Sequence, residues 1–584
     1  MKFYSTTEKN ALIVISLLKA HGIRFVIASP GTTNSAFVGS IQNDPSFKVF
    51  SAVDERSAAY MACGLAAETG EPVVISCTGA TASRNYVPGM TEAFYRKLPV
   101  LAITSMQPIA RVGHHVAQVV DRSRIQADVA RLSVRLPIVK DEEDQWECEI
   151  NVNKAILELS RHGGGPAHIE LPTTYALPFT EKESLQCRVI NRFTLTSALP
   201  GLDANKRVAV MIGAHKNWTA EETKALEEFC EHYNAVVFGD HTSGYKGKGR
   251  LQFSLAAAQE LHSKAELKPD ITLHIGEITG DYPLLGMAGK EVWRISPDGE
   301  IRDTFRRLRY VFEMPESSFF QHYADKSNQA GTDSYYRQCE SFLNTVRQKI
   351  PELPFSNVWL ASKMAARIPS GSAIHFGILN SLRTWNFFQL PDTVSSFSNV
   401  GGFGIDGGVS TLLGASLADA KKLYFGVIGD LAFFYDLNAI GNRHTPNNLR
   451  ILLVNNGKGI EFRLYNHHAS HFGEDGDEFV AAAGHYGNKS KSLVRDFAEN
   501  LGFEYLTASN KEEFEACYQR FLDPVLTGRP MLFEVFTDSD EESRALQVMH
   551  QLEVSADGKA RQLARKVLGR KRIATVKKIL KGKS

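Results

Sequence analysis

Two polar residues, each placed just after an apolar run, are the groups in this chain best suited to bind a metal ion. Asp430 follows Gly429 and the run 423–428, and Asn456 follows the run 451–454, 26 residues after Asp430. Carboxylate and amide oxygens are ligands that Mg²⁺ accepts, and Mg²⁺ is often bound together with a phosphate group of a ligand. The sequence therefore suggests a site for Mg²⁺ and a diphosphate, although either segment alone is also explained as a polar turn.

These two side chains can meet only if two strands run side by side. The run LYFGVI (423–428) predicts a buried strand, residues 435–442 a crossover helix, and ILLV (451–454) the next parallel strand. The carboxyl ends of neighbouring parallel strands lie at one edge of a sheet, where α/β proteins bind their ligands. We therefore expect Asp430 and Asn456 to lie together at that edge.

A further candidate is the carboxyl group of Glu55. An apolar strand is expected to end at Asp54 and Glu55, a small-residue helix to run from Arg56 to Thr69, and the next strand to cover 73–77. A carboxylate beside such a close-packed helix is partly dehydrated. Taken alone, Glu55 is better explained as a surface acid at a helix start, so the hypothesis depends on the residues near Asp430.

Together these segments resemble the thiamine-diphosphate-dependent enzymes that act on 2-oxo acids, a family that includes acetolactate synthase and pyruvate decarboxylase. The resemblance covers residues 1 to about 545, and the sequence segments are most similar to those of the family's menaquinone-pathway synthases. Three segments carry it: DERSAAYMACGLA (54–66), GDLAFFYDLNA (429–439) and SNVGGFGIDGG (398–408).

The resemblance implies a metal and diphosphate site with defined ligands. Asp430, Asn456 and the backbone carbonyl of Lys458 would hold Mg²⁺ on the diphosphate. Gly429 and Leu431 flank the first ligand, and Leu431 stands where most of the family has glycine.

The same resemblance implies how the rings of the cofactor are held. Glu55 would bind the pyrimidine ring, the carbonyl of Phe403 would receive its 4′-amino group, and Ile405 would prop the cofactor into its bent shape. The cofactor supplies an electron sink for the decarboxylation of a 2-oxo acid. A carboxylic acid at Glu55 would favour the form of the pyrimidine that removes the thiazolium proton.

The substrate side of the site leaves several functions open. His114 and His115 stand where simple 2-oxo acid decarboxylases carry paired histidines, and Gln118 stands where acetolactate synthases carry a glutamine. We favour decarboxylation followed by transfer of the acyl group to an acceptor. The alternatives are a simple decarboxylase that releases an aldehyde and an inactive, cofactor-binding scaffold. The histidines are also explained as structural residues.

The arginines with which the menaquinone-pathway members grip their substrate are absent here. Thr33, Val400 and Trp385 stand at their places. Arginine pairs carboxylates through two hydrogen bonds, which these residues cannot do. The resemblance is therefore to the mechanism more than to the substrate. The histidines of HHASH (467–471) would suit a lid or a metal, and solvated loop histidines are the simpler explanation.

Length predicts three domains, the alternation of predicted strands and helices makes each of them α/β, and the resemblance implies an enzyme with three doubly wound parallel-sheet domains. The chain has 584 residues, of which 43% are hydrophobic and 22% charged, as in a globular protein that folds around more than one core. We expect a pyrimidine-binding domain at 1–185, a central domain at 190–335 and a diphosphate-binding domain at 355–545. No G-x-G-x-x-G motif appears in the central domain, so no FAD is assigned. Seven cysteines without close pairs indicate reduced thiols.

The last segment, 546–584, lies outside the family pattern. From Lys559 onward it contains eleven Lys or Arg and no acid, with apolar residues at helical spacing. Such a basic amphipathic tail suits an anionic membrane surface, while a solubilising tail is the alternative. We expect a cytoplasmic homodimer or homotetramer, possible peripheral attachment at the inner membrane face, small-molecule substrates and no nucleic acid partner.

Overall fold

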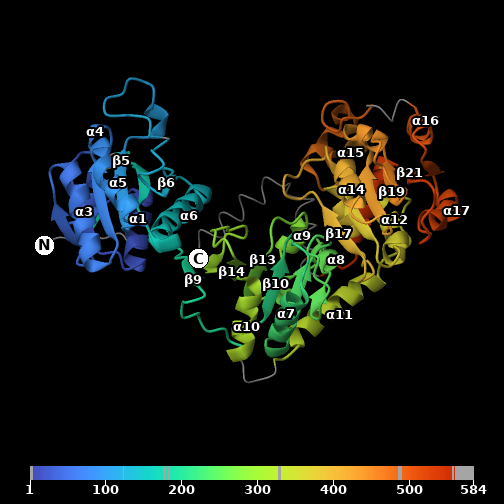
Figure 1. The fold of residues 1–584 in the computed structure, drawn as a ribbon, viewed down its shortest axis with the longest axis horizontal. Helices are drawn as coiled ribbons and strands as arrows, with labels where there is room; N and C mark the ends of the chain where they lie inside the picture. Colours follow the sequence, from blue (N-terminus) through green and yellow to red (C-terminus); the bar gives the residue numbers. More distant parts are fainter. Residues whose placement is uncertain are drawn as a thin grey trace. The chain divides into compact units, whose positions relative to one another are not determined.

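The structure, a computed structural model, describes residues 4–122, 124–174, 179–181, 185–326, 331–484, 490–555 and 558. The chain divides into two compact units. Figure 1 shows the helices and strands of both. Unit 1 comprises residues Met1–Thr196 and Gly299–Glu313, and unit 2 comprises Ser197–Asp298 and the residues from Met314 onward. The basic tail predicted from Lys559 onward lies outside the described residues.

Unit 1 is built on a six-stranded parallel sheet that is covered on both faces. Its strand order is β3 (Lys48–Ser51), β2 (Phe25–Ala28), β4 (Val73–Thr78), β5 (Val100–Met106), β7 (Ala167–Pro172), β6 (Leu132–Arg135). The central strands are buried along nearly their whole length, which explains why they read as continuous apolar runs.

Two helical layers enclose this sheet. Helices α1 (Lys9–Ala20), α2 (Ser35–Ile41) and α6 (Glu142–Glu158) share one core with the sheet, and α3 (Glu55–Thr69) and α5 (Val87–Tyr95) share the other. The remaining elements of unit 1 are α4 (Thr81–Asn85), η1 (Ile109–Arg111), η2 (Arg161–Gly163), the antiparallel pair β1 (Tyr4–Ser5) and β8 (Thr180–Glu181), and the parallel pair β9 (Asn191–Thr194) and β15 (Leu308–Glu313).

Unit 2 contains two parallel sheets. The strands of its first sheet follow the order β12 (Arg250–Leu251), β11 (Ala235–Gly239), β10 (Val208–Ile212), β13 (Ile271–Ile275), β14 (Glu291–Ser296). The helical segments that accompany this sheet are α7 (Ala220–His232), α8 (Ser254–Ala257), η3 (Ala265–Leu267), α9 (Tyr282–Leu285), α10 (Glu316–Lys326) and α11 (Ser334–Gln348).

The second sheet of unit 2 carries the predicted metal residues. Its order is β17 (Ser395–Ser398), β16 (Ala373–Phe376), β18 (Tyr424–Gly429), β19 (Leu449–Asn455), β21 (Met531–Phe536), β20 (Glu504–Ala508). Its helical segments are α12 (Asn357–Met364), η4 (Ala365–Arg367), α13 (Asn380–Trp385), α14 (Gly408–Ser416), α15 (Asp430–Tyr435), η5 (Leu437–Gly441), η6 (Ile460–Arg463), η7 (His468–Gly476), α16 (Leu493–Asn500), α17 (Lys511–Phe521) and α18 (Ser539–His550).

The three parallel sheets with flanking helices confirm the predicted fold class. The βαβ unit around Asp430 is confirmed as well, because β18 and β19 are parallel neighbours. The single crossover helix at 435–442 is wrong: α15 begins at Asp430 itself, and a 3₁₀ segment at Leu437–Gly441 completes the crossover. The boundaries of the three predicted domains stay a prediction.

Candidate active site

Glu55 opens helix α3 of unit 1, and it is half-buried. The helix begins here because the Asp54 carboxylate accepts a hydrogen bond from a backbone N–H of the first turn, and it ends at Gly70, which has φ 69°. The predicted strand end at Glu55 is wrong, since β3 ends at Ser51 and a short turn follows. Glu55 Oε2 accepts a hydrogen bond from Asn85 Nδ2 at 3.4 Å. Its catalytic role stays a prediction.

Small residues allow α3 to pack closely against its neighbour α5. Ala58, Ala59 and Ala62 are fully buried on the inner face of α3. A Cβ atom on Gly89 of α5 would lie 2.4 Å from the Cβ atom of Ala59, so only glycine fits there. This close packing fixes the start of α3, and with it the position of Glu55, against the sheet.

The loop after β5 carries His114, His115 and Gln118, and all three side chains are exposed. His115 has φ 56° and Gln118 has φ 62°, a backbone region that non-glycine residues rarely adopt. Ala80, just beyond the end of β4, has φ 57°. The loop lies against this turn, since the carbonyl of Gln118 is 3.7 Å from where a Cβ on Gly79 would be. Clustered backbone strain of this kind supports a functional hypothesis.

A buried ion-pair network that sequence reasoning missed anchors the end of this loop. The Arg122 guanidinium is 4% exposed, and its Nε donates to Glu170 Oε1 at 3.3 Å. Arg135 pairs with the other oxygen of the same carboxylate. The available signal was an acid inside an otherwise apolar strand, AHIELP (167–172). Breaking one member of such a buried set leaves a charge without its partner, which is costly.

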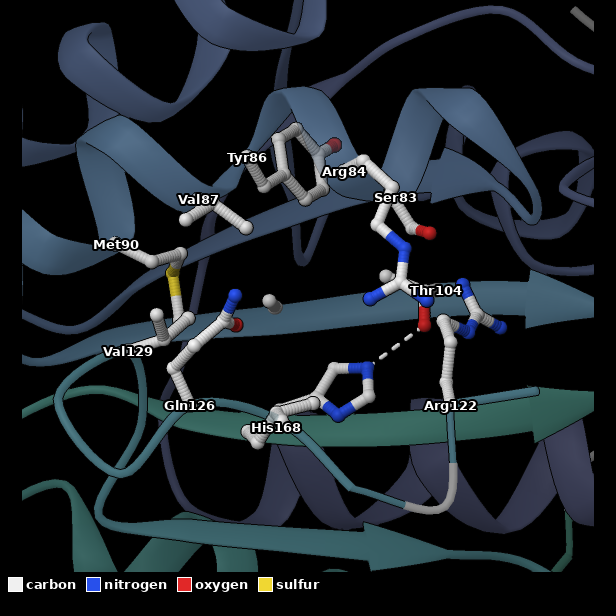
Figure 2. Close-up of a pocket in the computed structure, with 12 residues that line it drawn as sticks. Ser83, Arg84, Tyr86, Val87, Met90, Thr104, Arg122, Gln126, Val129 and His168 are labelled. Carbon is white, nitrogen blue, oxygen red and sulfur yellow. Dashed lines mark hydrogen bonds between the residues drawn. The ribbon is translucent and has the colours of Figure 1, made fainter. Parts of the chain in front are cut away.

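Figure 2 shows the small cavity of about 40 Å³ that lies beside this anchor. The side chains of Arg84, Arg122 and His168 approach Thr104 on β5. His168 Nε2 is 2.7 Å from Thr104 Oγ1, and its Nδ1 is 2.8 Å from Ser133 Oγ. Burial, followed by the positive charges of Arg122 and Arg135, lowers the pKa of His168 to about 3. The imidazole is therefore neutral and acts as a hydrogen-bonding strut between strands.

In unit 2, Asp430 is a buried carboxyl group with a strongly raised pKa. It is 6% exposed, and its Oδ2 accepts a hydrogen bond from the Gly457 backbone N–H at 2.9 Å. This bond joins the ends of β18 and β19, as the sequence predicted. Burial raises the pKa of Asp430 to about 7, and the charge of Glu534 adds to the shift. Burial also raises the pKa of Glu542 to about 7, and Asp430 contributes to that shift.

The two adjacent asparagines after β19 have different environments. Asn455 Nδ2 donates to Glu534 Oε1 at 2.7 Å, so its side chain is committed to the neighbouring strand. Asn456 Oδ1 is buried and has no hydrogen-bond partner in the described part of the chain. Asn456 precedes Gly457, whose N–H bonds to Asp430, so its buried, unpartnered carbonyl oxygen and the buried carboxylate are oxygen donors of the kind that a hard divalent cation accepts. The residues present therefore fit Mg²⁺.

Ion pairs brace the loop that follows Asn456. Lys458 Nζ pairs with Asp477 Oδ2 at 2.7 Å, and Arg463 Nη1 pairs with Asp477 Oδ1 at 3.1 Å. The Lys458 side chain is thus occupied, and only its backbone carbonyl is available as the predicted metal ligand. A Cβ on Gly459 would lie 3.3 Å from Leu431 Cδ2, so Leu431 packs against this loop.

Phe403 and Ile405 lie in the loop between β17 and α14. Phe403 has φ 57°, and its ring stacks on Tyr282 of α9 with centroids 6.4 Å apart. Ile405 is half-buried and is not among the buried core residues, so it differs from an ordinary core isoleucine. Both positions fit the predicted cofactor contacts, which stay predictions.

The side chains at the three positions of the absent arginines are all buried. Thr33 is 3% exposed, and its Oγ1 donates to the Ser105 carbonyl at 2.7 Å. Val400 is 2% exposed, and Trp385 is fully buried with its indole N–H donating to Asn357 Oδ1 at 3.1 Å. None of these side chains offers a charge to a carboxylate substrate.

The histidines of HHASH form no metal cluster in the described part of the chain, where no group of three His, Cys, Asp or Glu residues could hold a metal ion. His467 stacks on His468, and its Nδ1 accepts a hydrogen bond from the Ala469 N–H. Among the described residues, no helix is both long and apolar enough to cross a membrane.

Comparison with known proteins supports a relationship along almost the whole chain. The family described as "Thiamine pyrophosphate enzyme, N-terminal TPP binding domain" matches residues 9–125. The chain is 32% identical over 572 residues to the 2-succinyl-5-enolpyruvyl-6-hydroxy-3-cyclohexene-1-carboxylate synthase of Bacteroides fragilis, covering 93% of this chain and 99% of that protein. The synthase of the same name from Phocaeicola vulgatus is 31% identical over 553 residues, covering 92% and 97%. That of Flavobacterium johnsoniae is 27% identical over 471 residues, covering 77% and 84%.

Proposed function

We propose, from the premise that this chain belongs to the family of thiamine-diphosphate-dependent enzymes represented by these synthases, that it decarboxylates a 2-oxo acid and transfers the acyl unit to an acceptor. Family membership confirms the predicted cofactors, thiamine diphosphate and a divalent metal ion. It also confirms the prediction of an enzyme that acts on a carbon–carbon bond of a 2-oxo acid.

The observation that carries the proposal is the pair formed by Asp430 and Asn456. A carboxylate with a pKa raised to about 7 by burial, near an amide oxygen without a partner, is stabilised by a bound cation. These two groups and the Lys458 carbonyl would hold Mg²⁺ and, through it, the diphosphate. When bound, the cofactor supplies an electron sink for the electron pair left on the acyl carbon when CO₂ departs.

Other residues of the chain would orient the rings of the cofactor and protonate the acceptor. Glu55, fixed at the start of α3, would share a proton with a ring nitrogen of the pyrimidine. The carbonyl of Phe403 and the side chain of Ile405 would set the angle between the two rings. In the ligation step, the electron pair left when the bond to CO₂ breaks would form the new bond to the carbonyl carbon of the acceptor; the carbonyl π bond would open, and the acceptor oxygen would take a proton. His114, His115 and Gln118 lie on a loop suited to deliver that proton.

A simple decarboxylase is the second candidate. The exposed pair His114 and His115 favours it, because proton delivery to the acyl carbon releases an aldehyde. An inactive scaffold is disfavoured by the presence of Glu55, Asp430 and Asn456 together. The acceptor is expected to differ from that of the named relatives, because Thr33, Val400 and Trp385 replace the expected arginines.

We further propose a cytoplasmic homodimer or homotetramer in which Glu55 of one chain works with Asp430 of the partner subunit. The division of the family's domains supports this arrangement. The tail from Lys559 onward would add attachment to an anionic membrane surface, since it is strongly basic.

The test is a screen of 2-oxo acids with and without aldehyde or ketone acceptors, read by CO₂ release and product mass. We expect CO₂ from at least one acid and a ligated product with at least one acceptor. A variant with both His114 and His115 replaced by Phe separates the two candidates. A ligase loses ligated product and leaks aldehyde, whereas a simple decarboxylase retains CO₂ release and loses aldehyde. The absence of CO₂ with every acid would overturn the proposal.

A further inference from the structure

Unit 2 contains a cavity of about 330 Å³ that the proposed cofactor residues do not fill. Its volume is within the range of small-molecule sites. Its lining includes Asp281, Tyr282, Arg383, Phe387, Glu461, Leu464 and Leu546. The lining combines one ion pair and several polar groups with a wall of apolar side chains.

The cavity adjoins two segments already assigned to the cofactor site. Glu461 lies in η6, three residues after Lys458 of the metal loop. Tyr282, which also lines the cavity, stacks on Phe403, whose carbonyl is a predicted contact of the pyrimidine. A molecule in this cavity would therefore lie beside the place where the acyl unit is generated.

An ion pair forms the polar centre of the cavity. Arg383 Nη1 donates to Glu461 Oε1 at 2.6 Å, and Arg383 Nε donates to the Gly280 carbonyl at 3.3 Å. The guanidinium lies 4.6 Å from the centroid of the Tyr282 ring. Both charged side chains are about four-fifths buried. The second oxygen of Glu461, Oε2, is buried without a hydrogen-bond partner in the described part of the chain.

The charge of this lining disfavours a carboxylate ligand. Glu461 neutralises Arg383, and the buried carboxyl group of Asp281 adds a second acid to the wall. No net positive charge remains to pair with an anion. Arg383 and Glu461 both line the cavity, so a ligand that lies between these two side chains must donate to the carboxylate and accept from the guanidinium. A hydroxyl group supplies both, because it donates one hydrogen bond and accepts two.

We propose that this cavity binds the acceptor substrate and that the acceptor is an uncharged, polyhydroxylated carbonyl compound. Its hydroxyl groups bond to Arg383 and Glu461, and its C–H face packs on Phe387, Leu464 and Leu546. The inference rests on the proposed ligation of an acyl unit to an acceptor. It agrees with the absence of the arginines that would bind a dicarboxylate, and with the neutralisation of Arg383 by Glu461.

The experiment compares three aldehyde acceptors, with the donor that releases most CO₂ in the screen. D-glyceraldehyde is hydroxylated and uncharged, succinic semialdehyde carries a carboxylate, and propanal has neither group. The variants are Arg383→Gln and Glu461→Gln. Glu541→Gln is the matched control, since this acid of α18 pairs with Arg544 at the surface and does not line the cavity.

We expect the wild type and the Glu541→Gln control to prefer glyceraldehyde. Arg383→Gln and Glu461→Gln should each lower the ratio of ligated glyceraldehyde to CO₂ by about 10- to 100-fold, the effect of an unpaired polar group in a binding site. Glu461→Gln should also gain activity with succinic semialdehyde, because it frees the charge of Arg383. A gain of this kind cannot result from misfolding.

Each other outcome has a defined meaning. CO₂ release with a wild-type preference for the charged or the apolar aldehyde would overturn the acceptor inference and leave the proposed decarboxylation intact. An unchanged preference in Glu461→Gln would do the same. No CO₂ from any 2-oxo acid would overturn both proposals.

Discussion

Replacing His168 by glutamine should remove part of the acid sensitivity of unit 1. The imidazole is 6% exposed and bridges Thr104 and Ser133, at 2.7 and 2.8 Å. Its pKa is lowered from 6.5 to about 3, first by burial and then by the charges of Arg122 and Arg135. Glutamine can hydrogen-bond in the same place but does not titrate.

The sign follows from which state binds the proton. Between pH 6.5 and 3 the unfolded imidazole is protonated and the folded one is not, so the stability contributed above pH 6.5 is lost as the pH falls through this window. At pH 5, which is about 1.5 units below the pKa of the unfolded imidazole, proton binding stabilises the unfolded state by about 2 kcal/mol. At pH 7.5 the gain is close to zero. The variant should therefore lose about 2 kcal/mol less than the wild type between pH 7.5 and pH 5.

The assay is urea unfolding of both proteins at the two pH values, followed by hydrogen exchange in peptides that cover β7. Other buried histidines, such as His241, whose pKa burial also lowers to about 3, titrate equally in both proteins and cancel in the difference. Parallel curves for the wild type and His168→Gln from pH 7.5 to pH 5 would refute the argument.

Three further predictions concern the anchor, the assembly and the tail. Glu170→Ala leaves Arg122 and Arg135 without their partner, so it should destabilise unit 1 by about 3–5 kcal/mol and speed hydrogen exchange in residues 107–122. Unchanged exchange in these residues would show that the ion pairs do not hold the loop. Mixing inactive Glu55→Gln chains with inactive Asp430→Ala chains should restore about a quarter of wild-type turnover, because about half of random dimers are mixed and each mixed dimer has one intact site of its two. No recovery after subunit exchange would contradict the shared site. Deleting 559–584 should leave turnover unchanged and reduce salt-sensitive binding to anionic vesicles, whereas equal vesicle binding would exclude the tail as an anchor.

The strands that carry the site could be predicted because both faces of a parallel sheet are buried. The runs at 423–428 and 451–454 are apolar throughout, and both proved to be strands of the predicted sheet. Strand β6 could not be predicted because Leu132–Arg135 is an edge strand with only one buried residue, so its pattern resembles a loop. The helix at Asp430 was placed too late, since a polar residue after a strand also suits the start of a helix.

The contacts that shape the substrate side could not be predicted from spacing. Arg383 and Glu461 are 78 residues apart, and Arg122 and Glu170 are 48 residues apart, so only the folded chain brings them together. The sequence had indicated lost arginines at Thr33, Val400 and Trp385. It did not indicate that Arg383, two residues before Trp385, faces a cavity with its charge neutralised.

The central claim, that Glu55 activates a cofactor held through Asp430 and Asn456, is tested most directly by hydrogen–deuterium exchange at the thiazolium C2 of bound thiamine diphosphate. The proteins are the wild type, Glu55→Gln, and Glu71→Gln, an exposed acid paired with Arg24. With cofactor and Mg²⁺ bound in all three, exchange should be fast in the wild type and in Glu71→Gln and about 10²- to 10⁴-fold slower in Glu55→Gln. Exchange at the wild-type rate in Glu55→Gln would contradict the account.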